Sequence, residues 1–171
     1  MRILFICTGN IFRSLTAEYA LRRALSDQPH IEIASAGTED FPHVIWPVVR
    51  NYLQIHGLDV GAHRRRTLTR DMLAGSDLCV AMSTEHQEFV RRQFARELPL
   101  FTQVCGLAAQ PLPDVDAMVP DFATNEVAAA AHIRAIIDQI VVLTPRLAAR
   151  VLQRDPSLHP WLLPRSPGSS I

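Results

Sequence analysis

The chain opens with a short, continuous apolar run that is followed at once by a glycine-containing loop. Residues 2–6 (RILFI) indicate a strand that is buried on both faces, as strands of parallel sheets are. From Ser14 onward, Ala17, Leu21 and Leu25 recur at spacings of three and four, which predicts a helix with one apolar face. A strand, a tight loop and a helix in this order predict an α/β fold with a parallel sheet.

The alternation of strand-like and helix-like segments continues along the chain. Three further short runs indicate strands, and three longer amphipathic segments indicate helices, the second of them with Ser83 as its N-cap. We expect the strands over residues 30–34, 77–82 and 100–105, and the helices over residues 47–56, 84–95 and 125–143. This pattern predicts a three-layer, doubly wound sheet of about four parallel strands, with ligands at the carboxyl ends of the strands.

The length of 171 residues and the hydrophobic content of 48% fit one domain with an ordinary core. Thr144-Pro145 should interrupt the last helix, because proline removes a backbone donor and clashes with the preceding turn. We therefore expect a domain over residues 1–144 and a C-terminal extension over residues 145–171. The extension contains a short helix (146–154) and a proline-rich, partly ordered tail (155–171).

Charge and cysteine usage argue against several classes of protein. Lys plus Arg and Asp plus Glu number 17 each, so no overall basic field attracts nucleic acid or anionic lipid. Cys7, Cys79 and Cys105 are scattered and odd in number, which fits neither a disulfide framework nor a zinc motif. The apolar run at the start is too short for a signal-peptide core or a membrane span. We expect a soluble protein of the reducing cytoplasm; the oligomeric state is not indicated.

The loop between the first strand and the first helix has the sequence CTGNIFRS, residues 7–14. A loop that leads into a helix N-terminus offers unpaired N–H groups and partial positive charge to a phosphate-sized oxyanion, and Gly9 lets the backbone come close. The same environment favours the thiolate form of Cys7, which is then a nucleophile. Arg13 can offer a planar fork of donors to two phosphate oxygens. Ser14 can donate its hydroxyl to the sulfur and help it to leave when a thiophosphate is hydrolysed.

We therefore predict Cys7 as the nucleophile and Arg13, with the loop N–H groups, as the clamp on the phosphate. The predicted phosphate-binding residues are Thr8, Gly9, Asn10, Ile11, Phe12, Arg13 and Ser14. The plainer alternative is a buried cysteine that ends a strand and an arginine on the surface of the first helical turn. The strand before the loop, the glycine within it and the serine and helix after it favour the functional reading.

Together with Thr16-Ala17-Glu18, the loop resembles the signature of the low-molecular-weight protein-tyrosine phosphatase family, C-x-G-N-x-C-R-S followed by P-x-A-E. Further matches follow in the expected order. Ser35-Ala36-Gly37-Thr38 resembles the family's SAG turn, Phe41 falls where an aromatic residue is common, and His56-Gly57 followed by His63 resembles its HG…H stretch. The resemblance covers residues 2 to about 143.

The resemblance implies a flavodoxin-like sheet, a cysteinyl-phosphate intermediate, no metal or cofactor, and a phosphorylated protein as substrate. It also implies that Asn10, Ser14, Ser35 and His63 form a hydrogen-bond network that supports the loop. Without the resemblance, Ser35 would be read as a turn residue and His63 as a surface histidine in a basic run.

A phosphatase of this kind needs a carboxyl group that first protonates the leaving oxygen and then activates water. The long loop over residues 106–121 supplies two candidates. Asp121, within Val119-Pro120-Asp121-Phe122, resembles the family's V/I-P-D-P-Y segment and is the predicted acid; Asp114 is its rival. Either aspartate could instead simply cap a turn or a helix.

Several positions depart from the family pattern. Phe12 stands at the second loop cysteine, so a disulfide that protects the nucleophile cannot form. Leu15 replaces a proline that is favourable but not essential in a first helical turn. Phe122 follows the predicted acid where proline and aromatics are usual, and with Ile11 and Phe41 it is expected to line the substrate cleft. A threonine at the Ile11 position accompanies arginine-phosphate specificity in the family, so Ile11 favours phosphotyrosine.

Two alternative functions remain open from the sequence. An arsenate reductase uses the same loop but needs two further cysteines close to the site, and Cys79 and Cys105 fit that arrangement badly. A phosphoprotein-binding module with little catalysis is suggested by the altered acid loop. The intact Cys7, Arg13 and Ser14 argue against it, because binding alone does not need a thiolate.

Overall fold

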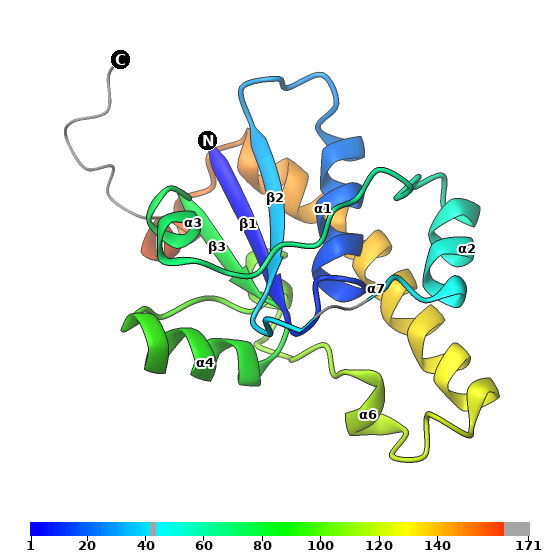
Figure 1. Ribbon diagram of the computed structural model, residues 1–171. Coiled ribbons are helices and arrows are strands. Elements are labelled where there is room, and N and C mark those ends of the chain that lie inside the picture. The colour runs from blue at the N-terminus through cyan, green and yellow to red at the C-terminus, as the bar shows by residue number, and fades with distance from the viewer. Residues whose placement is uncertain (42–43, 163–171) are drawn as a thin grey trace.

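A three-stranded parallel sheet forms the centre of the molecule, with β1 (Arg2–Cys7) between β2 (Glu32–Gly37) and β3 (Leu78–Ala81) (Figure 1). The computed structural model describes residues 1–41 and 44–162. In the register of the sheet, Ile3 lies opposite Ile33 of β2 and Leu78 of β3. The order of the strands is that of a doubly wound α/β fold, as the sequence predicts.

Side chains of β1 alternate between two hydrophobic clusters, one on each face of the sheet. Ile3 and Phe5 belong to the larger cluster, and Leu4 and Ile6 belong to the smaller one. A strand that is buried on both faces has no polar side, which explains the continuous apolar run in the sequence.

Helices cover both faces of this sheet (Figure 1). The larger cluster is completed by α1 (Arg13–Ala24) and α7 (Glu126–Leu152), which pack against each other, with α2 (Pro47–Ile55) against α7. The smaller cluster is completed by α3 (Arg70–Ala74) and α4 (Thr84–Phe94). The result is the predicted three-layer arrangement.

The fourth predicted strand, residues 100–105, is wrong in extent. Only Leu100 makes a parallel bridge, to Ala81, and the chain then turns into the short helix α5 (Phe101–Val104). The Gln103 side chain accepts a hydrogen bond from the Leu100 N–H at 2.9 Å and so caps this turn. A short apolar run of this kind does not distinguish a strand from a buried helical turn.

The predicted interruption at Pro145 is also wrong, because α7 runs through it to Leu152. Pro145 lies on the exposed side of the helix, where the carbonyl group that it leaves unpaired can face water. The predicted helix over residues 146–154 is therefore largely the C-terminal part of α7, and the predicted boundary at residue 144 falls inside a continuous helix. The 3₁₀ helix η1 (Pro156–Trp161) follows; residues 163–171 of the predicted tail lie outside the described residues.

Within the described part of the chain, α7 is the one helix long and apolar enough to cross a membrane, with a mean hydropathy of 1.6. Its apolar stripe, which includes Ile133, Ile137 and Ile140, is buried in the larger cluster. The other side of the helix carries charged residues such as Arg134 and Asp138. This distribution is that of a helix in the core of a globular domain.

Candidate active site

The CTGNIFRS loop begins where β1 ends, at the carboxyl edge of the sheet, and leads directly into α1. The end of β2 lies against it: a Cβ atom on Gly37 would come within 2.6 Å of the carbonyl oxygen of Thr8. Because no side chain fits in this space, Gly37 lets β2 pack against the backbone of the loop. The segment Ser35-Ala36-Gly37, which resembles the family's SAG turn, therefore forms the end of β2 and contacts the loop.

Asn10 holds the middle of the loop in a left-handed conformation with φ of 55°. Its side-chain amide donates to Ser14 Oγ at 3.1 Å and to Ser35 Oγ at 2.7 Å. His63 Nε2 is 3.0 Å from the Asn10 carbonyl oxygen, and the Arg66 N–H donates to Asn10 Oδ1 at 3.0 Å. The structure thus brings together all four residues of the predicted supporting network, and a backbone conformation that is uncommon for a non-glycine residue is fixed from several sides.

The His63 ring is best described as a neutral donor. Burial is the main effect on this side chain and lowers its pKa, so the ring carries no proton charge at neutral pH. The acceptor at Nε2 is a carbonyl oxygen, which requires the hydrogen to be on that nitrogen.

The network continues to Glu18, a buried carboxylate that the sequence analysis left without a role. Ser35 donates its hydroxyl to Glu18, and the side chains of Arg22 (2.6 Å) and Arg66 (3.4 Å) balance the charge. Its signal in the sequence is position: Glu18 follows Ser14 by four residues, so both lie on the same, buried face of α1.

Cys7 and Ser14 are in hydrogen-bond contact. Their Sγ and Oγ atoms are 2.9 Å apart, and both residues are buried. Since Ser14 Oγ also accepts from Asn10, the serine hydroxyl hydrogen is directed to the sulfur. A thiolate at Cys7 would therefore have a donor beside it.

Arg13, near the end of the loop and at the start of α1, is buried, with a 1% exposed fraction. Its Nη1 donates to the Leu112 carbonyl oxygen at 3.0 Å, and its Nη2 donates to Thr8 Oγ1 at 3.0 Å and to the carboxylate of Asp114. Its Nε–H has no hydrogen-bond partner among the described residues. A buried, unpaired guanidinium donor is costly, so this atom indicates that an acceptor belongs here.

The backbone of the loop offers more unpaired donors. Within the described residues, none of the N–H groups of residues 8–13 donates to a protein acceptor. The N-terminus of α1 adds partial positive charge at the same place, and the N-cap residue Phe12 makes no side-chain hydrogen bond to the described helix. An oxyanion in the loop would satisfy these donors and Arg13 Nε together.

Asp114, and not Asp121, lies beside these groups in the structure. Asp114 bonds Arg13 and lies 3.3 Å from Thr8 Oγ1. Asp121 is exposed and accepts a hydrogen bond from Asn125 at 3.2 Å, in the turn before α7. In Figure 1 this turn follows α6 (Val115–Met118) and leads into α7.

Long-range contacts explain why the chain places Asp114 here. The Leu112 N–H donates to the Met82 carbonyl oxygen at 2.8 Å, just after β3, and Arg13 bonds the Leu112 carbonyl. These two contacts fix Leu112 beside the loop, two residues before Asp114. The other carboxylate oxygen of Asp114 accepts from the Val115 N–H and caps α6. Spacing along the chain alone could not show this.

A hollow of about 500 Å³ opens beside Arg13 and Asp114. It is lined by Thr8, Arg13, Thr38, Glu39, Glu85, His86, Phe89, Asp114, Asp116 and Ala117. Of these, His86 also contacts Thr8, and no pattern in the sequence had singled it out. Among the described residues, no group of three or more His, Cys, Asp or Glu side chains is placed to hold a metal ion.

The three residues predicted to form the substrate cleft do not line this hollow. Ile11 is buried in the larger cluster, and the Phe41 side chain is largely exposed. Phe122 stacks on Trp46, with ring centroids 6.0 Å apart, beside a separate apolar hollow of about 560 Å³ between α2 and α7. Phe122 lies there because it follows Asp121 into the turn before α7; the role of the three residues in binding substrate stays a prediction.

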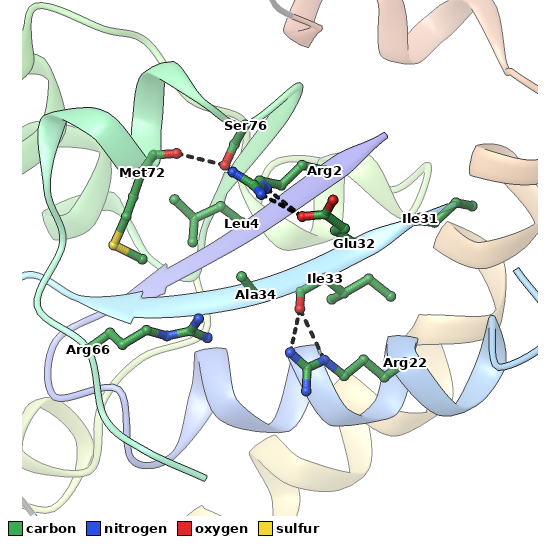
Figure 2. Close-up of a pocket in the computed structure, with 10 residues that line it drawn as sticks. All are labelled: Arg2, Leu4, Arg22, Ile31, Glu32, Ile33, Ala34, Arg66, Met72 and Ser76. Atoms are coloured by element: carbon green, nitrogen blue, oxygen red, sulfur yellow. Dashed lines mark hydrogen bonds and ion pairs between the residues drawn. The ribbon is translucent and has the colours of Figure 1, made fainter. Parts of the chain in front are cut away.

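A further hollow of about 500 Å³ lies at the free edge of β2 (Figure 2). Its arginines have partners: Arg2 bonds Glu32 and Arg22 donates to the Ile33 carbonyl oxygen. The residues that line it include no cysteine. Its chemistry is therefore unlike that of the loop.

The other two cysteines are buried and lie on opposite faces of the sheet. Cys79 belongs to the smaller cluster and Cys105 to the larger one. Burial raises the pKa of the Cys79 thiol to about 11 and that of the Cys105 thiol to about 12, so both stay protonated at neutral pH. Neither thiol is suited to a redox shuttle with Cys7.

Comparison with known proteins agrees with this geometry. The family model for low molecular weight phosphotyrosine protein phosphatases matches residues 2–152. The chain belongs to this family. It is 36% identical over 85 residues to the low molecular weight protein-tyrosine-phosphatase Etp of Escherichia coli (strain K12), which covers 49% of the chain and 55% of Etp.

Another similar protein is the protein-arginine-phosphatase of Bacillus subtilis (strain 168), with 28% identity over 104 residues, 56% of the chain and 65% of that protein. The matches thus span between about half and two thirds of the length of these relatives. Among solved structures, the YwlE arginine phosphatase from Geobacillus stearothermophilus has a TM-score of 0.74 at 23% identity, over 90% of the chain and 94% of YwlE. This likeness confirms the fold, and with it the flavodoxin-like arrangement expected from the sequence.

Proposed function

We propose that the protein is a phosphatase that hydrolyses phosphate monoesters, chiefly phosphotyrosine in proteins, through a phosphate-bearing Cys7. The observation that carries this proposal is the buried Nε–H of Arg13, which has no acceptor in the described part of the chain and lies near the end of a loop that begins with a cysteine. A phosphoryl group in the loop would supply the acceptor and would lie next to the sulfur. Membership of the family supports the same chemistry.

In the first step, the Cys7 thiolate attacks phosphorus, so that a sulfur–phosphorus bond forms as the bond to the ester oxygen breaks. Arg13 and the N–H groups of residues 8–13 bind the equatorial oxygens, where negative charge is spread in the transition state. The incoming phosphate competes with Asp114 for Arg13 Nη2. Asp114, displaced toward the leaving group, protonates the departing oxygen.

In the second step, water attacks the phosphocysteine, and Asp114 accepts its proton. The sulfur leaves as thiolate, stabilised by the hydroxyl of Ser14, whose Oγ is 2.9 Å away. Inorganic phosphate is released, and Asp114 is protonated again for the next turnover. The network through Asn10 and Ser35 keeps the serine and the loop in place throughout.

The residue at position 11 bears on the substrate class. The proteins named above are one tyrosine phosphatase and two arginine phosphatases. We favour phosphotyrosine because Ile11 stands where a threonine accompanies phosphoarginine specificity in the family. The three buried, unpaired cysteines fit a protein that acts on phosphoproteins in the reducing cytoplasm.

The first alternative, a phosphoprotein-binding module, loses its original support because Asp114 lies beside Arg13 even though Asp121 does not. The second, an arsenate reductase, needs accessible thiols near Cys7. Cys79 and Cys105 are buried in separate clusters, and their raised pKa values oppose it.

The test is steady-state hydrolysis of p-nitrophenyl phosphate, with reductant and without added metal, by the wild type and by Cys7→Ser. We expect turnover only in the wild type, while Cys7→Ser still binds inorganic phosphate. Cys79→Ala removes a buried thiol outside the loop and is the matched control; it should retain activity. Turnover by Cys7→Ser would overturn the mechanism, and phosphate binding without turnover by the wild type would favour the binding module.

A second comparison addresses the substrate. A phosphotyrosine peptide and a phosphoarginine peptide of otherwise identical sequence are given to the wild type and to Ile11→Thr. We expect the wild type to prefer phosphotyrosine and the variant to lose part of this preference. A wild type that prefers phosphoarginine would contradict the substrate assignment and leave the cysteine mechanism intact.

A further inference from the structure

A buried imidazole that the mechanism does not use lies behind the candidate active site. His86, in the first turn of α4, has a 2% exposed fraction. Its Nδ1 accepts a hydrogen bond from the Ser83 N–H at 3.0 Å. Because Nδ1 accepts this hydrogen bond, it carries no hydrogen of its own, so the hydrogen of the neutral ring is on Nε2. Burial, helped by the positive charge of Arg13, lowers the pKa of His86 to about 3 and keeps the ring neutral.

The Nε2–H of His86 is directed at Thr8. The distance from Nε2 to Thr8 Oγ1 is 3.0 Å, and Arg13 Nη2 donates to the same oxygen at 3.0 Å. A hydroxyl oxygen has two acceptor sites and one hydrogen. With both acceptor sites occupied, the hydroxyl hydrogen points to the remaining polar neighbour, Asp114 Oδ2, at 3.3 Å.

Three side chains thus form a hydrogen-bond chain with a fixed direction. It runs from the backbone of Ser83 through His86 and Thr8 to the carboxylate of Asp114. The chain connects the end of β3 and the start of α4 to the segment that carries the acid. Its members come from three separate stretches of sequence, which the fold brings together at the carboxyl edge of the sheet.

We propose that His86 is a positioning residue for the general acid: it orients the Thr8 hydroxyl toward Asp114 and so holds the acid beside Arg13 and the loop. This inference rests on the proposed function. His86 does not touch the reacting atoms; it acts through Thr8. Loss of the imidazole should therefore affect only the step in which Asp114 gives its proton to the leaving group.

The test compares aryl phosphates whose leaving groups do or do not need protonation. For His86→Phe, which keeps the volume but removes the donor, kcat/KM with phenyl phosphate should fall about tenfold, a part of the 10²–10⁴-fold that general-acid catalysis supplies. With 2,4-dinitrophenyl phosphate the loss should be less than about twofold, because this leaving group departs without a proton. We use kcat/KM because it reports the steps through the departure of the phenol.

His86→Gln and Thr8→Val complete the design. The glutamine amide can donate at the position of Nε2, so His86→Gln should recover most of the loss with phenyl phosphate. Thr8→Val removes the hydroxyl that relays the contact and should show the same dependence on the leaving group. It therefore tests the proposal even if His86→Phe fails to fold. In the Thr8→Val background, His86→Phe should lower kcat/KM with phenyl phosphate little further, because both residues act through one hydroxyl.

A matched control is His56→Phe, which alters a partly exposed histidine that bonds Asp138 on α7. This variant should have the kcat/KM of the wild type with both substrates. The positioning role would be overturned if His86→Phe lowered kcat/KM equally with both substrates. It would also be overturned if the effect of Thr8→Val on kcat/KM did not depend on the leaving group. A wild type that hydrolyses no aryl phosphate would instead contradict the proposed function, so the two failures are distinguishable.

Discussion

At the scale of single residues, the two aspartates of the long loop make the sharpest prediction. Asp114→Asn keeps the shape of the side chain but removes the proton donor beside Arg13. We expect kcat/KM with phenyl phosphate to fall about 10²–10⁴-fold, as for the loss of a general acid, and to fall less than about tenfold with 2,4-dinitrophenyl phosphate. Steady-state kinetics with the two substrates measures the difference.

Asp121→Asn is the control for this pair. Its carboxylate bonds Asn125 in an exposed turn, so its loss should change activity by less than about twofold with either substrate. If Asp121→Asn shows the dependence on the leaving group and Asp114→Asn does not, the turn before α7 must move to the loop during catalysis, and our assignment is wrong.

The residues of the loop could be predicted from sequence because their contacts are local. Cys7, Ser14 and Asn10 lie within eight positions, on a strand end, a turn and a helix start that the pattern indicates clearly. The sequence named Asp114 only as the rival of Asp121 and did not single out His86, because the places of both residues depend on contacts made about 80 to 100 residues away along the chain. The family motif pointed to Asp121 by its neighbours in sequence, whereas the fold brings Asp114 beside Arg13 through the contacts of Leu112.

At the scale of elements, prediction failed where local preference and tertiary packing disagree. Residues 100–105 have the composition of a strand, but Phe101 packs edge-on against Phe5 at 6.1 Å in the larger cluster, and the chain there is helical. At Pro145, proline argues for a helix end, but Leu143, Leu147 and Val151 continue the buried stripe on the opposite side. In both places burial of apolar side chains outweighs the local signal.

Pro145 therefore lowers the stability of α7, and its replacement should raise the free energy of unfolding. Proline in a helix interior is about 3 kcal/mol less favourable than alanine. Because Pro145 is exposed and also restricts the unfolded chain, we expect Pro145→Ala to raise the free energy of unfolding by about 1–3 kcal/mol. Urea unfolding followed by circular dichroism measures it.

The neighbouring exposed residue provides the comparison. Arg146→Ala also changes a surface position of α7 but leaves the backbone hydrogen bonds as they are, so the free energy of unfolding should stay within about 0.5 kcal/mol of the wild type. A decrease in stability for Pro145→Ala would mean that the proline fixes a bend on which the packing of α7 against α1 depends.

At the scale of the whole molecule, the buried imidazole of His86 couples stability to pH. Its pKa is lowered from 6.5 in the unfolded chain to about 3 in the fold, first by burial and then by Arg13. Between these values the unfolded state binds a proton that the folded state does not. Acid therefore favours unfolding, and the group contributes a loss of up to about 1.4 kcal/mol per pH unit as the pH falls from about 6.5 toward 3.

A variant that cannot titrate should lose this part of the acid sensitivity. Between about pH 6.5 and 4.5, the free energy of unfolding of the wild type should fall by roughly 2–3 kcal/mol more than that of His86→Gln, measured by urea unfolding at both pH values. Thr8→Val removes the hydrogen-bond partner but keeps the buried imidazole, so it should follow the wild type. Parallel pH profiles for the wild type and His86→Gln would show that the folded protein takes up this proton over the same pH range as the unfolded chain, which would contradict the lowered pKa of the buried His86 imidazole.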